Sequence, residues 1–287
     1  MKLARLGPPG AEKPALIEAG GRARDLSGIV PDITAEALGS GLLQRLAALD
    51  PSALPYLPDG ERFGPPVRGV GKFLCVGLNY RDHAAESGIA IPEEPVLFMK
   101  ATSAICGAND AIVIPRGSLK TDWEVELGVV IGRTARDIPV ETALAHVAGY
   151  LLVNDLSERA FQLERGGQWV KGKSCDTFGP IGPFLVTTEE IPDPQALSLW
   201  LEVNGTRRQN GHTSDMVFDV AFLISYISRF MTLCPGDIIS TGTPAGVGLG
   251  LRPPVYLGPG DRMVLGIDGE AGVSLGCQTQ ICRAWAQ

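Results

Sequence analysis

The spacing of the short apolar runs constrains the fold of this chain more than any other feature. Runs such as 73–76, 149–153 and 263–267 contain four or five residues, and turns separate them at short, irregular intervals. Glycine occurs 36 times and proline 22 times among the 287 residues, which is typical of a chain with many turns. A parallel α/β sheet would instead alternate strands with helical segments of about 10–15 residues. The sequence therefore predicts an α+β fold that is mostly β.

The chain is predicted to divide into a small N-terminal α+β domain, residues 1–65, and a larger domain, residues 66–287. Alternation of apolar and polar residues over 13–26 indicates a hairpin. Thr34 can cap a helix over 35–49, in which leucines recur at helical spacing.

Residues 51–66 contain several prolines, and this segment is predicted to be a linker. Beyond it, helical periodicity is confined to 140–146 and 217–231. The other predicted strands are 96–98, 123–131, 181–186, 199–203 and 237–240.

Charge and composition exclude several classes of protein. The net charge is −7 and no Lys/Arg-rich run exists, so no nucleic-acid partner is expected, because such binding relies on phosphate contacts. No apolar stretch approaches the roughly 20 residues of a membrane helix, and Gly7 and two prolines interrupt the N-terminal one. The six cysteines form no C-x-x-C pair and are predicted to be buried, reduced thiols. We therefore expect a cytoplasmic protein that makes no membrane contact.

Two glutamates are expected on one face of the strand predicted over 123–131. Residues two apart in a strand share a face, so Glu124 and Glu126 point the same way, opposite the apolar residues that alternate with them. A solvated strand face is the ordinary position of such a pair. The strand continues as Val129–Ile131, however, which is apolar on both faces and must enter a core. Two carboxylates beside a core need a compensating cation.

A third carboxylate, Asp155, directly follows the predicted strand 149–153 and Asn154. Capping of a helix would explain an aspartate at this place equally well. Together with the glutamate pair, Asp155 would instead complete a site made of oxygen ligands only. Such a site suits a hard cation, Mg²⁺ or Mn²⁺.

His83 and Glu86 are three residues apart, so they share a face if the segment is helical. The carboxylate could then orient and polarise the imidazole as a general base requires. A turn of surface helix is the alternative. Because Gly88 would end any helix and the following residues resemble a loop, residues 80–95 could form a movable lid.

Residues 167–174, GQWVKGKS, fit the phosphate-loop pattern G-x-x-x-x-G-K-S. A phosphate loop follows a hydrophobic strand and opens a helix, and neither context is present, so this interpretation is rejected. Lys173 remains available as an active-site cation. The Gly-rich turn at 240–248 is either structural or able to hold a carboxylate through backbone N–H groups.

Together and in this order, these segments resemble the fumarylacetoacetate hydrolase superfamily over about residues 72–282. The matching segments are GLNYRDHAAE (77–86), DWEVELGVVIG (122–132), VNDLSER (153–159), KGKSCDTFGPIGP (171–183) and PGDIISTGTPAGVG (235–248). The resemblance implies a mixed β-roll or sandwich for the catalytic domain and a homodimer.

The resemblance also implies roles for individual residues. Three carboxylates, Glu124, Glu126 and Asp155, would hold Mg²⁺ or Mn²⁺. His83 and Glu86 would be the water-activating dyad on a lid, with Lys173 as the active-site lysine. The positions that correspond to substrate contacts are Arg159 and Gln162 along the pocket and Tyr80 and Thr243 near the substrate carboxylate.

The implied activity is metal-dependent hydrolysis of a carbon–carbon bond in a small anionic 2,4-dioxo acid, giving pyruvate and a second acid. The small N-terminal module resembles the branch that includes 2,4-dioxo-3-deoxy-L-fuconate and L-rhamnonate hydrolases of sugar-acid catabolism. The superfamily also includes acylpyruvases, oxaloacetate decarboxylases, isomerases and proteins labelled ureidoglycolate lyase. A non-enzymatic metal-binding protein would leave His83, Glu86 and Lys173 unexplained.

Overall fold

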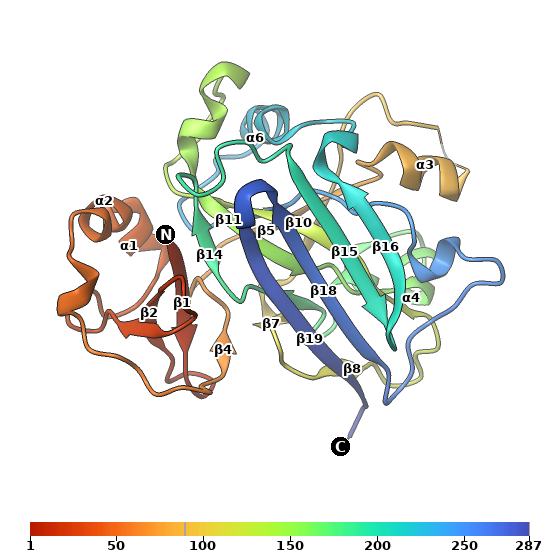
Figure 1. Ribbon diagram of the computed structural model, residues 1–287. Helices are drawn as coiled ribbons and strands as arrows, with labels where there is room; N and C mark the ends of the chain where they lie inside the picture. The colour runs from red at the N-terminus through yellow and green to blue at the C-terminus, as the bar shows by residue number, and fades with distance from the viewer. Residues whose placement is uncertain (89, 287) are drawn as a thin grey trace.

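The computed structural model describes residues 1–88 and 90–286, and most of its strands belong to two sheets that pack against each other (Figure 1). The path of the larger sheet is β3 (Ala23–Asp25), β2 (Lys13–Ile17), β1 (Lys2–Leu6), β14 (Leu185–Thr187), β11 (Val147–Asn154), β10 (Val125–Ile131), β17 (Ile238–Ser240), β5 (Phe73–Gly77) and β6 (Val96–Lys100). Beside this path lie β4 (Phe63–Gly64), β7 (Ile105–Gly107) and β13 (Gly179–Ile181).

The smaller sheet has the order β16 (Thr206–His212), β15 (Leu197–Val203), β18 (Arg262–Gly269), β19 (Ser274–Ala284) and β8 (Ile112–Ile114). A separate pair joins β9 (Thr121–Asp122) to β12 (Ser157–Glu158). The helices are α1 (Ala35–Gly39), α2 (Leu42–Ala47), α3 (Arg81–Ser87), α4 (Arg159–Leu163), α5 (Val170–Lys173) and α6 (Val220–Ser228). The short 3₁₀ helices are η1 (Pro51–Ala53), η2 (Thr102–Ala104), η3 (Val140–His146), η4 (Thr213–Asp215), η5 (Gly248–Gly250) and η6 (Glu270–Gly272). The predicted α+β fold, mostly β, is confirmed.

The central strand β10 takes part in two hydrophobic cores. Its odd-numbered side chains over 125–131 pack with Leu199 and other residues of the smaller sheet. Val130, on the opposite face, packs with Leu38 and the other apolar side chains of α1 and α2. The prediction that this strand enters a core on both faces is therefore confirmed. Because side chains alternate along a strand, Glu126 shares the face of Val130.

The N-terminal residues fold as predicted in outline but not in detail. The hairpin is confirmed as the antiparallel pair β2 and β3. Thr34 caps α1, its Oγ1 accepting from the backbone N–H of Ala37 at 3.1 Å. The single helix predicted over 35–49 is wrong, because Gly41 takes a left-handed φ of 80° that separates α1 from α2.

The segment 51–66 is not a free linker. It contains η1 and β4, and β4 pairs with β1. Since β1 also pairs with β14, the larger sheet continues from the first residues into the rest of the chain. The domain boundary at residue 65 stays a prediction.

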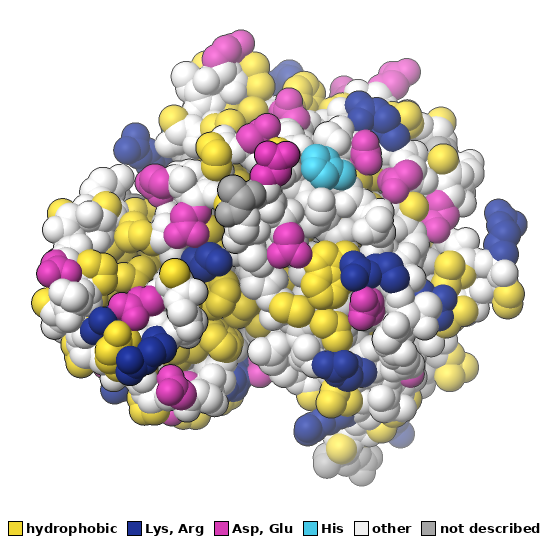
Figure 2. Space-filling view, in the orientation of Figure 1, with side chains coloured by type: hydrophobic (Ala, Val, Ile, Leu, Met, Phe, Trp, Pro, Cys, Tyr) yellow, Lys and Arg dark blue, Asp and Glu magenta, His cyan; other side chains and the backbone are white. Residues whose placement is uncertain are grey.

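On the face shown in Figure 2, the N-terminal residues form a rounded lobe beside the rest of the molecule. Lys and Arg side chains on this face are scattered among Asp and Glu. No helix in the described part of the chain is long and apolar enough to cross a bilayer. The cysteines are free, as predicted, and Cys75 and Cys282 are buried. The prediction that all six cysteines are buried is wrong, because Cys234 and Cys277 are exposed.

Several predicted elements have different bounds. The helix predicted over 217–231 is shorter, because Asp219 caps α6 by accepting from the N–H of Phe222 at 2.7 Å. The segment 140–146 is a 3₁₀ helix, and the strand predicted over 181–186 divides into β13 and β14.

Strands β1, β16 and β19 were not predicted. In β19 the reason is that buried positions hold glutamines. Gln278 is fully buried and donates to the carbonyl oxygens of Leu152 and Gly182 at 3.0 and 2.8 Å. Amides at inward positions hide the alternation by which a strand is recognised.

Because the core between the sheets holds β10 in place, Leu127→Ala should destabilise the protein by about 2–5 kcal/mol through loss of buried contacts and the cavity left behind. The control is Leu119→Ala, since Leu119 is 84% exposed. Its effect should stay within about 0.5 kcal/mol. Urea unfolding of both variants measures the difference, and equal midpoints would contradict the central position of Leu127.

Candidate metal centre and active site

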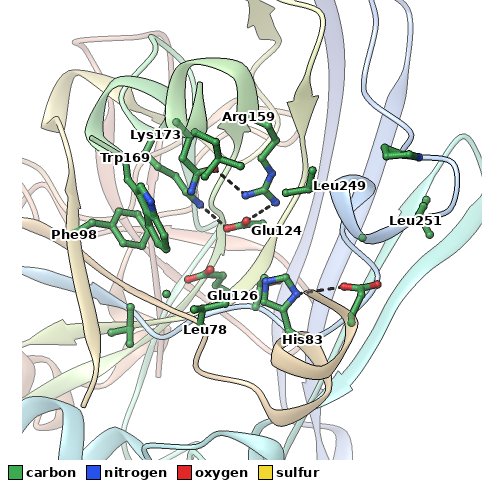
Figure 3. A pocket seen from close by; sticks show the side chains of 18 of the residues that line it. Leu78, His83, Phe98, Glu124, Glu126, Arg159, Trp169, Lys173, Leu249 and Leu251 are labelled. Atoms are coloured by element: carbon green, nitrogen blue, oxygen red, sulfur yellow. Dashed lines mark hydrogen bonds and ion pairs between the residues drawn. The ribbon is translucent and has the colours of Figure 1, made fainter. Parts of the chain in front are cut away.

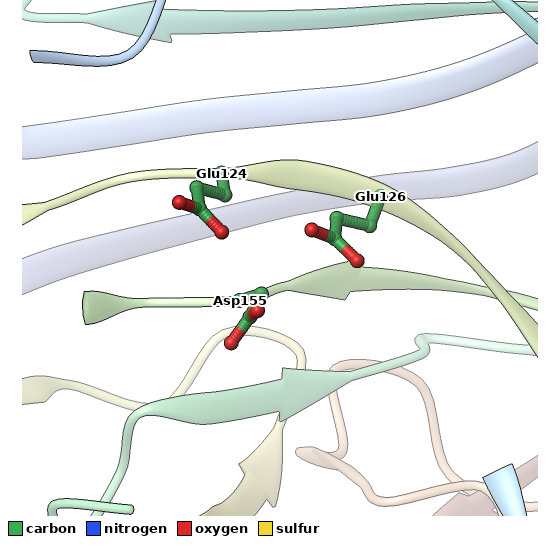
Figure 4. Close-up of side chains that lie close together, drawn as sticks. All are labelled: Glu124, Glu126 and Asp155. Atoms are coloured by element: carbon green, nitrogen blue, oxygen red, sulfur yellow. The ribbon is translucent and has the colours of Figure 1, made fainter. Parts of the chain in front are cut away.

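The pairing of β10 with β11 brings together the three carboxylates predicted to bind metal. Val125 pairs with Asn154, and the N–H of Asp155 donates to the carbonyl oxygen of Glu124 at 2.9 Å, one step beyond the paired strands. Asp155 therefore lies opposite Glu124, on the same face of the sheet. Carboxylate oxygens of these two residues and Glu126 lie within 4.8 Å of one another (Figure 4).

All three carboxylates are buried, with 5% or less of each residue exposed, and cationic side chains surround two of them. Glu124 contacts Lys173 Nζ at 2.6 Å and Arg159 Nη2 at 2.7 Å. Asp155 contacts Lys173 Nζ at 2.7 Å and forms a second ion pair with the fully buried Lys100. Buried carboxylates persist only with such compensation.

The two glutamates therefore differ in their electrostatic surroundings. Burial opposes ionisation of Glu124, but the charges of Lys173 and Arg159 lower its pKa to about 2. Burial, followed by repulsion from Asp155 and Glu124, holds the pKa of Glu126 well above its usual value. Among the described residues, Glu126 has only neutral hydrogen-bond donors, Ser240 Oγ at 2.6 Å and the N–H of Gly242 at 2.9 Å.

A divalent cation fits this cluster. The converging ligand atoms are carboxylate oxygens only, which suits Mg²⁺ or Mn²⁺ and not zinc. The fit is strongest at Glu126, because its carboxylate has no ion pair among the described residues and a dication there would favour its ionised form.

The predicted dyad also faces this cluster. On α3, His83 Nδ1 lies 3.3 Å from Glu86 Oε2, and the N–H of Gly246 donates to both carboxylate oxygens of Glu86. Gly88 ends the helix with a left-handed φ of 65°, as predicted. The predicted lid, residues 80–95, includes residue 89, which lies outside the described residues, and its movement stays a prediction.

Glu124, Glu126, His83 and Glu86 line one cavity of about 450 Å³ (Figure 3), and Asp155 lies behind the lining. Phe98 and Trp169 form one side of it, with ring centroids 5.3 Å apart and planes inclined at 65° in an edge-to-face contact. The lining residues are Val76, Gly77, Leu78, His83, Glu86, Phe98, Glu124, Glu126, Arg159, Gln162, Leu163, Trp169, Lys173, Thr243, Leu249, Gly250, Leu251, Arg252 and Pro254.

Lys173 reaches the carboxylates from the short helix α5. The structure of this segment also differs from that of a phosphate loop. The preceding element is helix α4 and not a strand. Gly172 is required for packing, since a Cβ there would lie 2.5 Å from the carbonyl oxygen of Glu158. The glycine lets α5 approach α4 closely enough for Lys173 and Arg159 to meet the same glutamate.

The four predicted substrate-contact residues are placed differently. Arg159, Gln162 and Thr243 line the cavity, and Gln162 Oε1 accepts from Arg159 Nη1 at 3.1 Å. Tyr80 is fully buried outside the lining, and its hydroxyl has no hydrogen-bond partner among the described residues. Contact of these residues with substrate stays a prediction.

Sequence reasoning missed two charged residues that hold the site together. Lys100, at the end of β6, pairs with Asp155 and donates to the carbonyl oxygen of Leu156 at 2.9 Å. Asp122 is fully buried and accepts from Arg159 Nε at 2.8 Å. Its place beside the glutamate pair was the only available signal, and nothing near Lys100 in the sequence marks it.

Comparison with known proteins gives a consistent family relationship. Residues 72–280 match the family described as Fumarylacetoacetate (FAA) hydrolase C-terminal. A Burkholderia multivorans protein, named only provisionally as a hydrolase, is 60% identical over 99% of both chains. Fumarylacetoacetate hydrolase from Exiguobacterium antarcticum has a TM-score of 0.88 at 37% identity, covering 99% of this chain and 100% of that one.

A further solved structure carries ligands. It is maleylpyruvate hydrolase from Sphingobium sp. SYK-6 in complex with manganese(II) ion and pyruvate. Its TM-score is 0.81 at 27% identity, with complete coverage of both chains.

Because Lys100 compensates a buried carboxylate, Lys100→Met should destabilise the metal-free protein by about 3–5 kcal/mol. The matched control is Lys120→Met, which removes an exposed ion pair with Glu164 and should leave stability nearly unchanged. Urea unfolding after chelator treatment measures both variants. Equal stability of the two would show that Lys100 does not compensate Asp155.

The carboxylate cluster predicts that Mg²⁺ or Mn²⁺ raises the melting temperature of chelator-treated protein, by the equivalent of about 2.7 kcal/mol at a hundredfold excess over Kd. Glu126→Gln should abolish this rise without preventing folding, because the uncharged amide keeps the shape of the carboxyl group and avoids repulsion from Asp155 and Glu124. Glu141→Gln, at an exposed position, is the control and should respond like the wild type. The same metal-induced rise in Glu126→Gln would refute the assignment.

Proposed function

Because the chain belongs to the fumarylacetoacetate hydrolase family, we propose that it is a Mg²⁺- or Mn²⁺-dependent hydrolase that cleaves a carbon–carbon bond in a 2,4-dioxo acid. One observation carries the proposal. A histidine polarised by a carboxylate, His83 with Glu86, opens into the same cavity as Glu124 and Glu126 of the carboxylate cluster. A positioned base beside a cation site is what addition of water to a polarised carbonyl needs.

The products are proposed to be pyruvate and a second carboxylic acid. The related maleylpyruvate hydrolase was solved with manganese and pyruvate, which supports a 2-oxo acid as the part of the substrate nearest the carboxylates. The cluster of Glu124, Glu126 and Asp155 offers the oxygen ligands for such a cation. A bound divalent cation would supply the positive charge that polarises the 2-oxo acid and stabilises the enolate of pyruvate.

The chain's own residues account for the movement of protons. His83 accepts a proton from the water whose oxygen adds to carbon 4, while Glu86 orients the imidazole and stabilises its positive charge. The bond between carbons 3 and 4 then breaks, its electron pair going to carbon 3. Carbon 4 becomes the new carboxylate, and carbon 3 is protonated to give pyruvate. Lys173 Nζ is the donor placed to stabilise developing oxyanion charge.

Decarboxylation and isomerisation are the main alternatives within the family, together with a ureidoglycolate lyase. Decarboxylation adds no water and needs no base to activate it, so the His83–Glu86 pair favours hydrolysis over decarboxylation. Isomerisation also uses a base, to move a proton between carbons, and differs from hydrolysis because it adds no water to its product. A metal-binding protein without activity would give this pair no role.

Loss of the base should separate hydrolysis from decarboxylation. His83→Ala should lower kcat for an acylpyruvate by about 10²–10⁴-fold, the usual range for a positioned acid–base group. Glu86→Gln should cost less, because Glu86 only orients and polarises His83. Metal binding should persist in both variants, since neither residue is a proposed ligand. His212→Ala, outside the cavity, is the matched control and should retain wild-type turnover.

The product of the same assay identifies the reaction. Cleavage in H₂¹⁸O should place the label in the carboxylate derived from carbon 4, as mass spectrometry can detect. Pyruvate formation without label in the second acid would replace hydrolysis by a lyase or decarboxylase reaction. Undiminished turnover in His83→Ala would remove His83 from the mechanism.

A further inference from the structure

We propose that the cavity selects a hydrocarbon group, alkyl or aryl, on carbon 4 of the substrate and disfavours a polyhydroxylated one. This inference rests on the proposed function, because it takes the 2-oxo acid end to lie at the carboxylate cluster. It differs from the sugar-acid substrates that the sequence resemblance implies. The argument comes from the segment 248–254 and from the hydrogen bonds already made by the polar lining.

Hydrogen bonds fix the segment 248–254 relative to the carboxylate cluster. The N–H groups of Gly248 and Leu249 donate to the carboxylate of Asp122 at 2.6 and 3.0 Å. Asp122 also binds Arg159 Nε at 2.8 Å, and the same guanidinium holds Glu124. The position of Leu249 is therefore coupled to a predicted metal ligand through two side chains.

The same segment also touches the dyad. A Cβ added at Gly250 would lie 2.3 Å from Glu86 Cδ, so the backbone there is packed directly against the dyad carboxylate. Leu249 and Leu251, on either side of Gly250, both line the cavity. Figure 3 shows both leucines on the side of the cavity where His83 meets its partner. A group attached to the carbon that His83 serves will meet these leucines.

The other walls of the cavity are apolar as well. Phe98 and Trp169 form the opposite side in Figure 3. The remaining apolar lining side chains are Val76, Leu78, Leu163 and Pro254. A substituent on carbon 4 that extends away from the carboxylate cluster therefore contacts apolar side chains on both sides of the cavity.

Several polar lining groups are already engaged in hydrogen bonds. Thr243 Oγ1 donates to the carbonyl oxygen of Val125 at 2.9 Å and accepts from Gln209 Nε2 at 2.8 Å. Arg159 is held by two carboxylates and by the amide oxygen of Gln162. Arg252 also lines the cavity and is exposed to solvent.

The consequence for specificity follows from desolvation. Hydroxyl groups on the substituent would give up hydrogen bonds to water and find few replacements, whereas an alkyl or aryl group gains by burial. An apolar pocket discriminates against added hydroxyls by about 10²-fold or less, so the preference should be clear but not absolute.

Binding of two inert ligands tests the inference without relying on catalysis. The ligands are 2-oxohexanoate and 4,5,6-trihydroxy-2-oxohexanoate, which have equal chain length and no 4-oxo group to be cleaved. Isothermal titration with Mg²⁺-loaded wild type should give at least about tenfold tighter binding of 2-oxohexanoate. Leu251→Asn should shrink this ratio, whereas Leu251→Met should keep it. Leu119→Asn, at a residue outside the cavity, is the control and should also keep it.

Equal binding of the two ligands, or preference for the trihydroxy acid, would overturn the inference. If the ratio of the two affinities is unchanged in Leu251→Asn, Leu251 does not contribute to the proposed selectivity. Preference for 2-oxohexanoate in a protein that hydrolyses no 2,4-dioxo acid would support the inference and overturn the proposed reaction. If neither ligand binds, a 2-oxo acid does not lie at the carboxylate cluster, and the inference is overturned as well.

Discussion

Compensation of buried negative charge is the interaction on which the rest of this structure depends. Four buried carboxylates, Asp122, Glu124, Glu126 and Asp155, share three buried cationic side chains: Lys100, Arg159 and Lys173. These cations come from β6, α4 and α5, which are distant from β10 in the sequence. Each element must dock for the carboxylates to be tolerated, so folding and assembly of the site are one event. The shortfall of positive charge falls at Glu126, where a dication fits.

The same ionic network links the carboxylate cluster to one wall of the cavity. Asp122 is bonded on one side to the arginine that holds Glu124 and on the other to the backbone of 248–249. The charged side chains that hold the carboxylate cluster therefore also position a wall of the cavity. A site whose supporting residues are themselves locked by hydrogen bonds can hold its geometry with little reorganisation.

Sequence patterns predicted what depends on local periodicity. Alternation in β10 placed Glu124 and Glu126 on one face, and the apolar strand before Asp155 indicated a third carboxylate. Register made these three meet, and register depends on pairing between strands that are far apart in the chain. Lys100 lies after an apolar run that shows nothing of its partner, and Gln278 looks like a surface residue until β19 is seen to be buried. The break at Gly41 was missed because the leucine spacing continues across it.

The first strand of the chain has a consequence for how the protein can be shortened. Because β1 covers the outer side of β14 and also carries β2 and β4, removing the first 65 residues would do more than delete a module. It would uncover a row of unpaired backbone donors and acceptors along β14, and the apolar side chains of the second core beside them. Uncovered edges of this kind recruit strands from other molecules. We therefore expect the N-terminal residues to protect the larger sheet from aggregation.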